Sequence, residues 1–155
     1  MSLEVKHLTK IYNQQKAIND ISFNISKGEI VGFLGPNGAG KSTTMKIATS
    51  YIPPTSGDVI VCGYNVVESP MEVKRVVGYL PEHNPLYLDM YVHEYLYFVG
   101  GIHGLKGKFL SDRISNMIEL CGLTLEQNKL IGTLSKGYRQ RVGLAQALIH
   151  DPEVL

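Results

Sequence analysis

The sequence has no large excess of charge of either sign, no long apolar run and few cysteines, and each absence narrows its possible functions. Its 155 residues carry a formal net charge of +1, so a polybasic attraction to nucleic acid or acidic lipid is not indicated. Its apolar runs are far shorter than the roughly 20 residues that a membrane span needs. The first residues lack a basic segment followed by an apolar stretch, so we expect no signal peptide.

The cysteines and histidines are few and scattered. Cys62 and Cys121 stand alone, in no metal-binding spacing, and suit a reducing compartment. We expect both to be small buried apolar side chains. The five histidines show no metal-binding spacing either. What the chain does have, 44% hydrophobic and 19% charged residues, is typical of a soluble globular domain with its own core.

The stretch Ile30–Thr44 carries the strongest functional signal. Ile30–Leu34 is a short apolar run, which predicts a buried strand. Residues 35–42 then read Gly-x-x-x-x-Gly-Lys-Ser, the Walker A pattern. A helix is expected over Thr43–Tyr51. A strand, a glycine loop and a helix in this order form the structural context in which the pattern binds phosphate.

The chemistry of this pattern follows from its residue types. Glycines adopt backbone angles closed to other residues, so successive amide groups turn inward around phosphate oxygens. The helix that follows points its positive dipole end at the same anion. Lys41 adds a cation for the β- and γ-phosphates, and the Ser42 hydroxyl is placed to bind Mg²⁺. The alternative is a glycine-rich turn with an incidental lysine. The predicted phosphate-binding residues are Gly35, Pro36, Asn37, Gly38, Ala39, Gly40, Lys41, Ser42 and Thr43.

Two alternating segments precede this stretch. Leu3–Leu8 places Leu3, Val5 and His7 on one side of a strand, and Ala17–Ser26 alternates in the same way. They predict an antiparallel sheet beside a nucleotide-binding core. After the glycine loop, the pattern predicts a strand over Asp58–Cys62, a helix over Pro70–Val76 and a buried strand over Val76–Leu80.

From about Tyr91 to Asn128 the signals are helical. Two apolar stripes are expected on consecutive helices, and Gly122 is expected to end the second helix. The aromatic stripe either packs against the second helix or docks a partner. A third helix begins at Ser135 as its cap and runs to His150, and Glu153–Leu155 begins what reads as a strand. The stripes are Tyr91, Tyr95, Phe98 and Ile102, with Val92, Leu96 and Val99 beside them; Leu110, Ile114, Met117, Ile118 and Cys121; and, on the third helix, Tyr138, Val142, Ala145 and Ile149.

The two motifs together point to a family. Leu134-Ser135-Lys136-Gly137-Tyr138, following a helical insert and a Walker A pattern, resembles the signature Leu-Ser-Gly-Gly-Gln of ABC transporter ATP-binding subunits. Leu134, Ser135 and Gly137 match, whereas Lys136 and Tyr138 depart from it. Residues 139–148 also resemble the family's continuation. Residues 80–87, Leu-Pro-Glu-His-Asn-Pro-Leu-Tyr, are similar to exporter-type ATPases, including those linked to bacterial gliding motility.

The resemblance implies a fold and a reaction. The fold is α/β, a P-loop NTPase of ABC type whose mixed sheet has an antiparallel β part and an inserted helical subdomain. Residues 1–84 and 129–155 would form the ATP-binding core, and 85–128 the helical subdomain. The reaction implied is ATP hydrolysis with Mg²⁺, by phosphoryl transfer to water, which powers a membrane partner.

The resemblance also assigns roles to single residues. Tyr12 would stack on adenine, although an ordinary strand-end tyrosine is the alternative. Glu82 stands where the family has a glutamine that contacts Mg²⁺ or the attacking water, and the alternative is a solvated loop carboxylate. Lys41 and Glu82 are thus the catalytic candidates, and Ser42 and Glu82 the metal ligands. Ser135 and Gly137 would touch the γ-phosphate held by a second subunit, or Ser135 is simply a helix cap. Lys136 either adds a cation there or lies in solvent.

The implied partners are a second ATP-binding subunit, paired head to tail, and a transmembrane permease, with no nucleic acid. The expected location is cytoplasmic, on the inner face of the cell membrane. The family's Walker B aspartate, catalytic glutamate and switch histidine are not found in these residues, so we expect an N-terminal fragment without sustained turnover and with exposed apolar sheet surface. A non-catalytic nucleotide-binding fragment and another P-loop enzyme, such as a small-molecule kinase, remain alternatives.

Overall fold

The computed structural model describes residues 1–155 and divides them into two compact units. The first comprises residues 1–77 and Val154, and the second comprises residues 78–153 and Leu155. The first unit contains β1 (Leu3–Tyr12), β2 (Gln15–Ile25), α1 (Lys41–Ala48), β3 (Ser56–Val61), β4 (Tyr64–Asn65) and α2 (Pro70–Val76). The second contains α3 (Val92–Ile102), α4 (Gly107–Leu120), the 3₁₀ turn Ile131–Thr133 and α5 (Lys136–Leu148).

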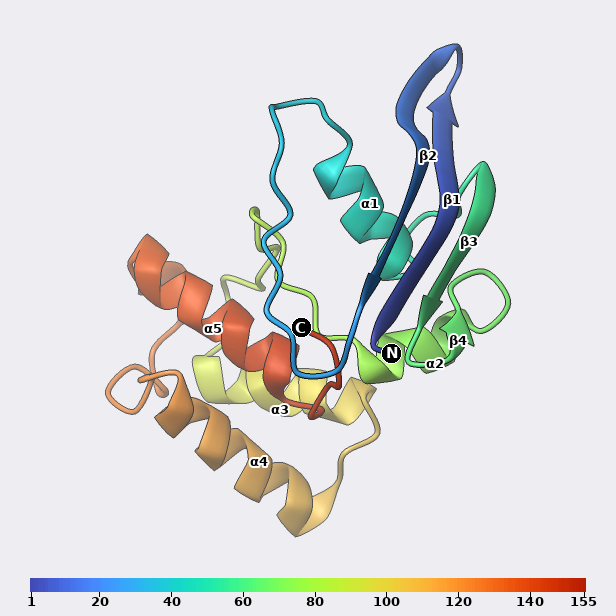
Figure 1. Ribbon diagram of the computed structural model, residues 1–155. Coiled ribbons are helices and arrows are strands. Elements are labelled where there is room, and N and C mark those ends of the chain that lie inside the picture. Colours follow the sequence, from blue (N-terminus) through green and yellow to red (C-terminus); the bar gives the residue numbers. More distant parts are fainter. The chain divides into compact units, whose positions relative to one another are not determined.

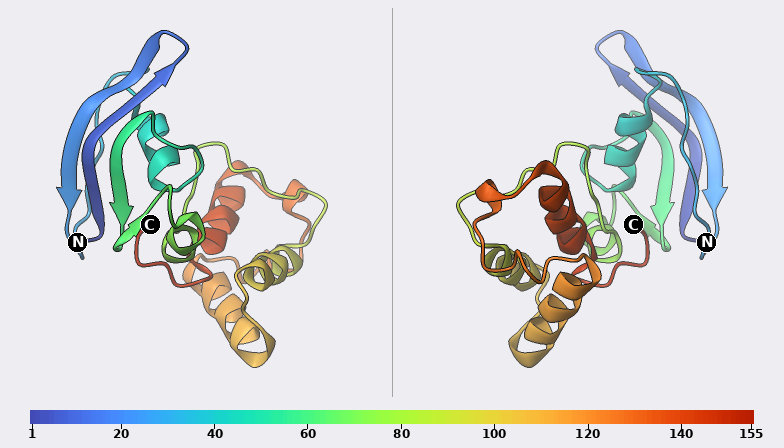
Figure 2. Two further views of the ribbon diagram at one scale, coloured as in Figure 1. Left: turned by 90° about the vertical axis from the view of Figure 1, so that its right-hand side faces the viewer. Right: turned by 90° about the vertical axis from the view of Figure 1, so that its left-hand side faces the viewer.

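The first unit is built on an antiparallel sheet with the strand order β2-β1-β3-β4. Its three long strands lie side by side, and α1 lies against one face of them (Figures 1 and 2). This mixture of sheet and helices confirms the predicted α/β class and the antiparallel β part. The core of the unit consists of Val5, Leu8, Ile18, Ile47, Val59, Val61, Val66 and Val73, all of them buried.

The alternation predicted for the first strand is interrupted by a bulge. His7 has a left-handed backbone (φ 49°), and the pairing of β1 with β2 shifts register between Val5 and Leu8. A bulge of this kind turns the following side chain to the other face. Val5 and Leu8 are therefore the buried residues, whereas His7 is exposed and its ring nitrogen lies 2.8 Å from a carboxylate oxygen of Asp20. The prediction that His7 shares the apolar side was wrong.

The buried strand predicted for Ile30–Leu34 does not form. Residues 26–40 connect β2 to α1 without any strand, and Ile30 and Leu34 are 103% and 93% exposed (Figure 1). Only Phe33 has a ring partner, Phe23, with the ring centres 5.5 Å apart. A buried strand needs hydrogen-bonded neighbours, and no described strand pairs with this segment. The backbone of the apolar run thus remains unpaired.

The second predicted buried strand, Val76–Leu80, is also wrong. It is reduced to a single parallel bridge between Val77 and Val154, with the Val154 amide donating to the Val76 carbonyl at 3.0 Å. The strand expected from Glu153 onward is present only as that bridge. In contrast, the helix Pro70–Val76 forms with the predicted bounds, because Pro70 occupies the first turn, where its missing amide costs no hydrogen bond.

In the second unit, α3 buries Tyr95 and the three apolar side chains that were predicted beside the aromatic stripe, but not the rest of that stripe. Of the predicted aromatic face only Tyr95 is buried, whereas Tyr91, Phe98 and Ile102 are exposed. The buried side chains are Val92, Tyr95, Leu96 and Val99. The Tyr95 hydroxyl donates to the Gln146 side-chain carbonyl at 2.6 Å, and burial raises the pKa of Tyr95 to about 12. Tyr91, Phe98 and Ile102 therefore lie outside the core of this unit, and the Phe98 ring contacts that of Tyr87, with the ring centres 5.9 Å apart.

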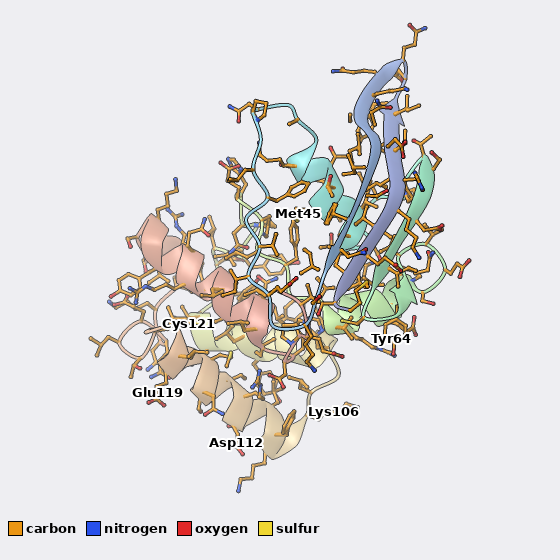
Figure 3. The ribbon with its side chains drawn as sticks, in the orientation of Figure 1. Met45, Tyr64, Lys106, Asp112, Glu119 and Cys121 are labelled. Atoms are coloured by element: carbon orange, nitrogen blue, oxygen red, sulfur yellow. The ribbon has the colours of Figure 1, made fainter.

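The other two helices follow the sequence closely. The predicted stripe of α4 is buried, and Asp112 and Glu119 lie on its outer side (Figure 3). Ser135 caps α5, where its hydroxyl accepts a hydrogen bond from the Tyr138 amide at 3.3 Å. Cys121 is buried, as predicted, but Cys62 is only half-buried, and neither cysteine forms a disulfide. None of the helices combines the length and the apolar character that crossing a membrane requires.

Candidate functional site

The glycine loop ends at a helix whose first amide groups are not capped by a side chain. Gly38 and Gly40 both have left-handed backbones, with φ of 83° and 86°. Gly40 is the N-cap of α1, and it has no side chain to accept a hydrogen bond. The amides of the first turn consequently have no intrahelical acceptor and lie at the positive end of the helix dipole. This is an arrangement that binds an anion.

Gly40 is fixed from two sides. A Cβ atom at this position would collide with the Ala17 carbonyl oxygen and lie 3.1 Å from Cγ1 of Ile18. On the helix side, the Thr44 hydroxyl donates to the Gly40 carbonyl at 3.0 Å, and Thr44 is almost fully buried. The loop is thus anchored to β2 and to α1. The role of Thr44 was not predicted, and its only sequence signal is a third hydroxyl residue after Ser42 and Thr43.

The side chain of Lys41 closes the loop. Its ammonium group donates to the carbonyl oxygens of Gly35 at 2.6 Å and Pro36 at 2.8 Å. The Ala39 amide donates to the same Pro36 carbonyl at 3.2 Å, which forms the turn. An ammonium has three protons, so one remains for an anion while two are held by the loop. The loop therefore places a cation beside unoccupied amide donors, as a polyphosphate requires.

The residues available for a divalent cation fit Mg²⁺ held mainly by phosphate. Ser42 is exposed in the first turn of α1 and offers one hydroxyl oxygen. No group of three or more His, Cys, Asp or Glu side chains in the 155 residues could hold a metal ion. Mg²⁺ commonly keeps its waters and uses one or two protein ligands plus phosphate oxygens. The donor set is consistent with that mode and not with a metal cage made of protein alone.

Tyr12 belongs to the same unit as the glycine loop. It ends β1, is paired with Gln15 across the hairpin turn, and is 48% exposed. The Lys10 ammonium lies 5.2 Å from its ring centre. The same hairpin contributes Ala17, which contacts Gly40. The tyrosine ring thus has open surface on which a planar base can stack.

The remaining predicted site residues, Glu82, Ser135 and Gly137, belong to the second unit. All three are exposed, and the Glu82 carboxylate has no hydrogen bond or ion pair. Lys136, the departure from the signature, is exposed in the first turn of α5. A cavity of about 430 Å³ lies between the Glu82 loop and this turn. It is lined by Glu82, His83, Asn84, Pro85, Leu86, Leu88, Lys136, Arg139 and Gln140.

The comparisons with known proteins agree with the phosphate-binding geometry of the glycine loop. The family model described as "ABC transporter" matches residues 18–155. An uncharacterized ABC transporter ATP-binding protein of Bacillus subtilis, YxlF, is 38% identical over 99% of this chain, which spans 50% of that protein. The bacitracin transport ATP-binding protein BcrA of Bacillus licheniformis is 37% identical over 99% of this chain and 49% of its own length.

A solved structure described as the ATP-binding subunit of an ABC transporter is similar throughout. It superposes with a TM-score of 0.88 at 30% sequence identity, covering 98% of this chain and 63% of that one. The chain spans about half the length of the curated relatives YxlF and BcrA. What these proteins share with it is therefore the part that contains the glycine loop and the α5 motif.

Proposed function

This chain belongs to the ABC transporter family, and we propose that it forms part of an ATP-binding subunit that hydrolyses ATP to drive a membrane partner. The observation that carries this proposal is the glycine loop. Gly38 and Gly40 have left-handed backbones, the first turn of α1 has free amides, and Lys41 supplies a cation beside them. These three features meet the charge and the donor requirements of a bound polyphosphate.

Each predicted site residue of the first unit has a role in this proposal. The loop amides orient the phosphates, and Lys41 exchanges its carbonyl partners, Gly35 and Pro36, for phosphate oxygens. Ser42 donates its hydroxyl oxygen to Mg²⁺, which supplies charge neutralisation at the β- and γ-phosphates when bound. Tyr12 stacks on the adenine ring. Glu82, from the second unit, supplies a carboxylate to the same metal or to the attacking water.

The second unit would act on a neighbouring subunit. Ser135 and Gly137 lie exposed at the first turn of α5, whose amides and dipole attract an anion. We place them at the γ-phosphate that another copy binds in a head-to-tail dimer. The division into a core of residues 1–84 and 129–155 with a helical subdomain of residues 85–128 also remains a prediction. A Ser135→Arg variant tests the dimer, because a bulky cation at that turn should prevent closure and spare monomeric nucleotide binding.

The membrane partner is a permease, and the subunit would lie on the cytoplasmic face of the membrane. The relatives support this assignment: BcrA is named a bacitracin transport ATP-binding protein. Reading the coding sequence beyond Leu155 tests whether a Walker B aspartate and a catalytic glutamate follow. A continuation without an acidic pair after the next apolar residues would favour a binding role without catalysis.

The decisive experiment is a lysine substitution with a matched control on the same helix. In the complete subunit of which we propose this chain is part, Lys41→Ala should lower ATP hydrolysis at least about 100-fold, because the cation acts on charge that develops in the transition state. Lys46→Ala, an exposed lysine in the last turn of α1, should leave the rate within about twofold. Equal rates for the two variants would contradict the proposal, as would wild-type nucleotide affinity in the Lys41→Ala protein.

A further inference from the structure

The loop that carries Glu82 has almost no internal structure of its own. Residues 78–91 form neither helix nor strand. Within residues 81–86, the one main-chain hydrogen bond joins the Leu86 amide to the Asn84 carbonyl at 3.0 Å. A segment of this kind takes its conformation from whatever it lies against. In the second unit that neighbour is α5.

The loop lies against one face of α5. At its start, Gly78 lies so close to the Ala147 carbonyl that a Cβ atom would collide with it. Further along, the Asn84 side chain lies against Gly143, where any side chain larger than hydrogen would collide with the Asn84 amide nitrogen. Positions 140, 143 and 147 of α5 share one helical face, because they are three and four residues apart.

Gln140 provides the polar contact of this face. Its side-chain amide donates to the Glu82 carbonyl at 3.3 Å, across 58 positions of sequence. The Glu82 carbonyl is held in this way, whereas the Glu82 carboxylate is left exposed and unpaired. Beyond Gln140, toward the first turn of α5, the loop and the helix diverge around the cavity lined by Lys136 and Arg139. Gln140 itself also lines this cavity.

We propose that Gln140 is a positioning residue that sets the place of the Glu82 carboxylate by holding its main chain against α5. The inference rests on the proposed function, in which Glu82 contacts the metal or the attacking water. Gln140 touches neither.

The test compares two glutamines that make the same kind of bond. Gln140→Glu replaces the amide donor by a carboxylate that cannot donate to the Glu82 carbonyl. Gln140→Met removes the donor without adding charge and serves if the glutamate variant folds poorly. Gln127→Glu is the matched control, because Gln127 donates to the Thr124 carbonyl at 2.9 Å, in a local turn away from the loop.

Two readouts separate positioning from general stability. Amide hydrogen exchange over residues 80–88 should become up to about tenfold faster in the Gln140 variants and stay unchanged in Gln127→Glu. In the complete subunit, the Mg²⁺ concentration that half-saturates ATP hydrolysis should rise about tenfold, as expected when a contact that orients a metal ligand is lost. The same rise is expected in Glu82→Ala, with no further rise in the double variant, since both act on one carboxylate.

Several results would overturn this inference. Unchanged exchange in the Gln140 variants would show that the contact does not hold the loop. Faster exchange with a wild-type Mg²⁺ requirement would leave Gln140 a purely structural residue. If Glu82→Ala raises the Mg²⁺ requirement while the Gln140 variants do not, the inference fails and the proposed function stands. If Glu82→Ala itself has no effect, the metal role of Glu82 fails, and the positioning role fails with it.

Discussion

The N-termini of α1 and α5 are both exposed, and both are predicted to bind phosphate. They differ in whether a side chain caps the free amides of the first turn. At α1 the N-cap is Gly40, left-handed and without a capping side chain. At α5 the N-cap is Ser135, whose hydroxyl already accepts the Tyr138 amide. The first start is open to a ligand through its main chain alone. The second satisfies one of its own amides, so a ligand there must compete with a side chain.

The two starts also depend on different parts of the sequence. The conformation at α1 comes from the Gly40 backbone packed against Ala17, whereas the conformation at α5 comes from a serine side chain within its own turn. A side chain added at Gly40 should be costly, whereas a side-chain cap tolerates truncation at modest cost. The predictions below test this difference, from the largest expected effect to the smallest.

Of the changes at the two helix starts, the largest effect is expected from a methyl group at Gly40. Gly40→Ala should lower the free energy of unfolding by about 3 kcal/mol, because it adds left-handed strain and a collision with the Ala17 carbonyl. Gly38→Ala, with a similar φ but no atom within 4 Å of the added carbon, should cost only about 1 kcal/mol. Denaturant melts of the two variants measure the difference. Equal costs would mean that the loop is not fixed against β2.

The Ser135 cap of α5 should contribute less to the free energy of unfolding than the fit of Gly40 does. Ser135→Ala removes the acceptor of the Tyr138 amide and should destabilise the protein by about 1 kcal/mol. Ser42→Ala, at an exposed serine of α1 that caps nothing, should stay within about 0.5 kcal/mol. Thermal melts without nucleotide provide the measurement. A Ser42→Ala cost as large as that of Ser135→Ala would remove the contrast between the two helix starts.

These outcomes bear on what the sequence could predict. Features set by a few neighbouring residues were predicted correctly: the Ser135 cap, the helix Pro70–Val76 and the antiparallel pairing of the first two strands. The glycine loop belongs with them, since two of its glycines take the left-handed backbone that the pattern requires. The helix after it begins at Lys41, two residues earlier than predicted, and ends at Ala48.

Features that need distant neighbours were predicted poorly. Apolar runs at residues 30–34 and 76–80 indicate buried strands, but burial and hydrogen bonding require partner strands that the run itself does not contain. On α3 both faces near Tyr95 are apolar, so periodicity could not tell which one faces the core. The contact between the Glu82 loop and α5 could have been predicted from one feature of the sequence. Gly143 lies in the middle of a helix, and a glycine there indicates close approach of another segment.

A pH effect should arise in the second unit. The rings of His103 and His150 stack with centres 3.9 Å apart. Burial, and then the charge of His150, lowers the pKa of His103 from 6.5 to about 4. Between these values the unfolded chain binds more protons than the folded one, so stability should fall as the pH drops from 6.5 toward 4.

The size of the pH effect is limited by solvent. His103 as a whole is exposed and only its ring face is covered by His150, so we expect a loss of no more than about 1 kcal/mol. Urea melts at several pH values measure it, with His103→Gln as the variant that should flatten the profile. His93→Gln, at an exposed histidine on the same helix, is the control. An unchanged slope in His103→Gln would assign the acid sensitivity to other groups.

The smallest effect is expected where the sequence predicted the most burial. Ile30→Ser should change the free energy of unfolding by less than about 0.5 kcal/mol, since Ile30 is exposed and its segment pairs with no strand. Ile47→Ser, in the fully buried core of the same unit, should cost about 4 kcal/mol. Ile30→Ser should also reduce self-association in sedimentation experiments, because it removes exposed apolar surface. A cost at Ile30 that approaches the cost at Ile47 would mean that the run forms a buried strand in solution, and that the glycine loop is held by a sheet as well as by α1 and β2.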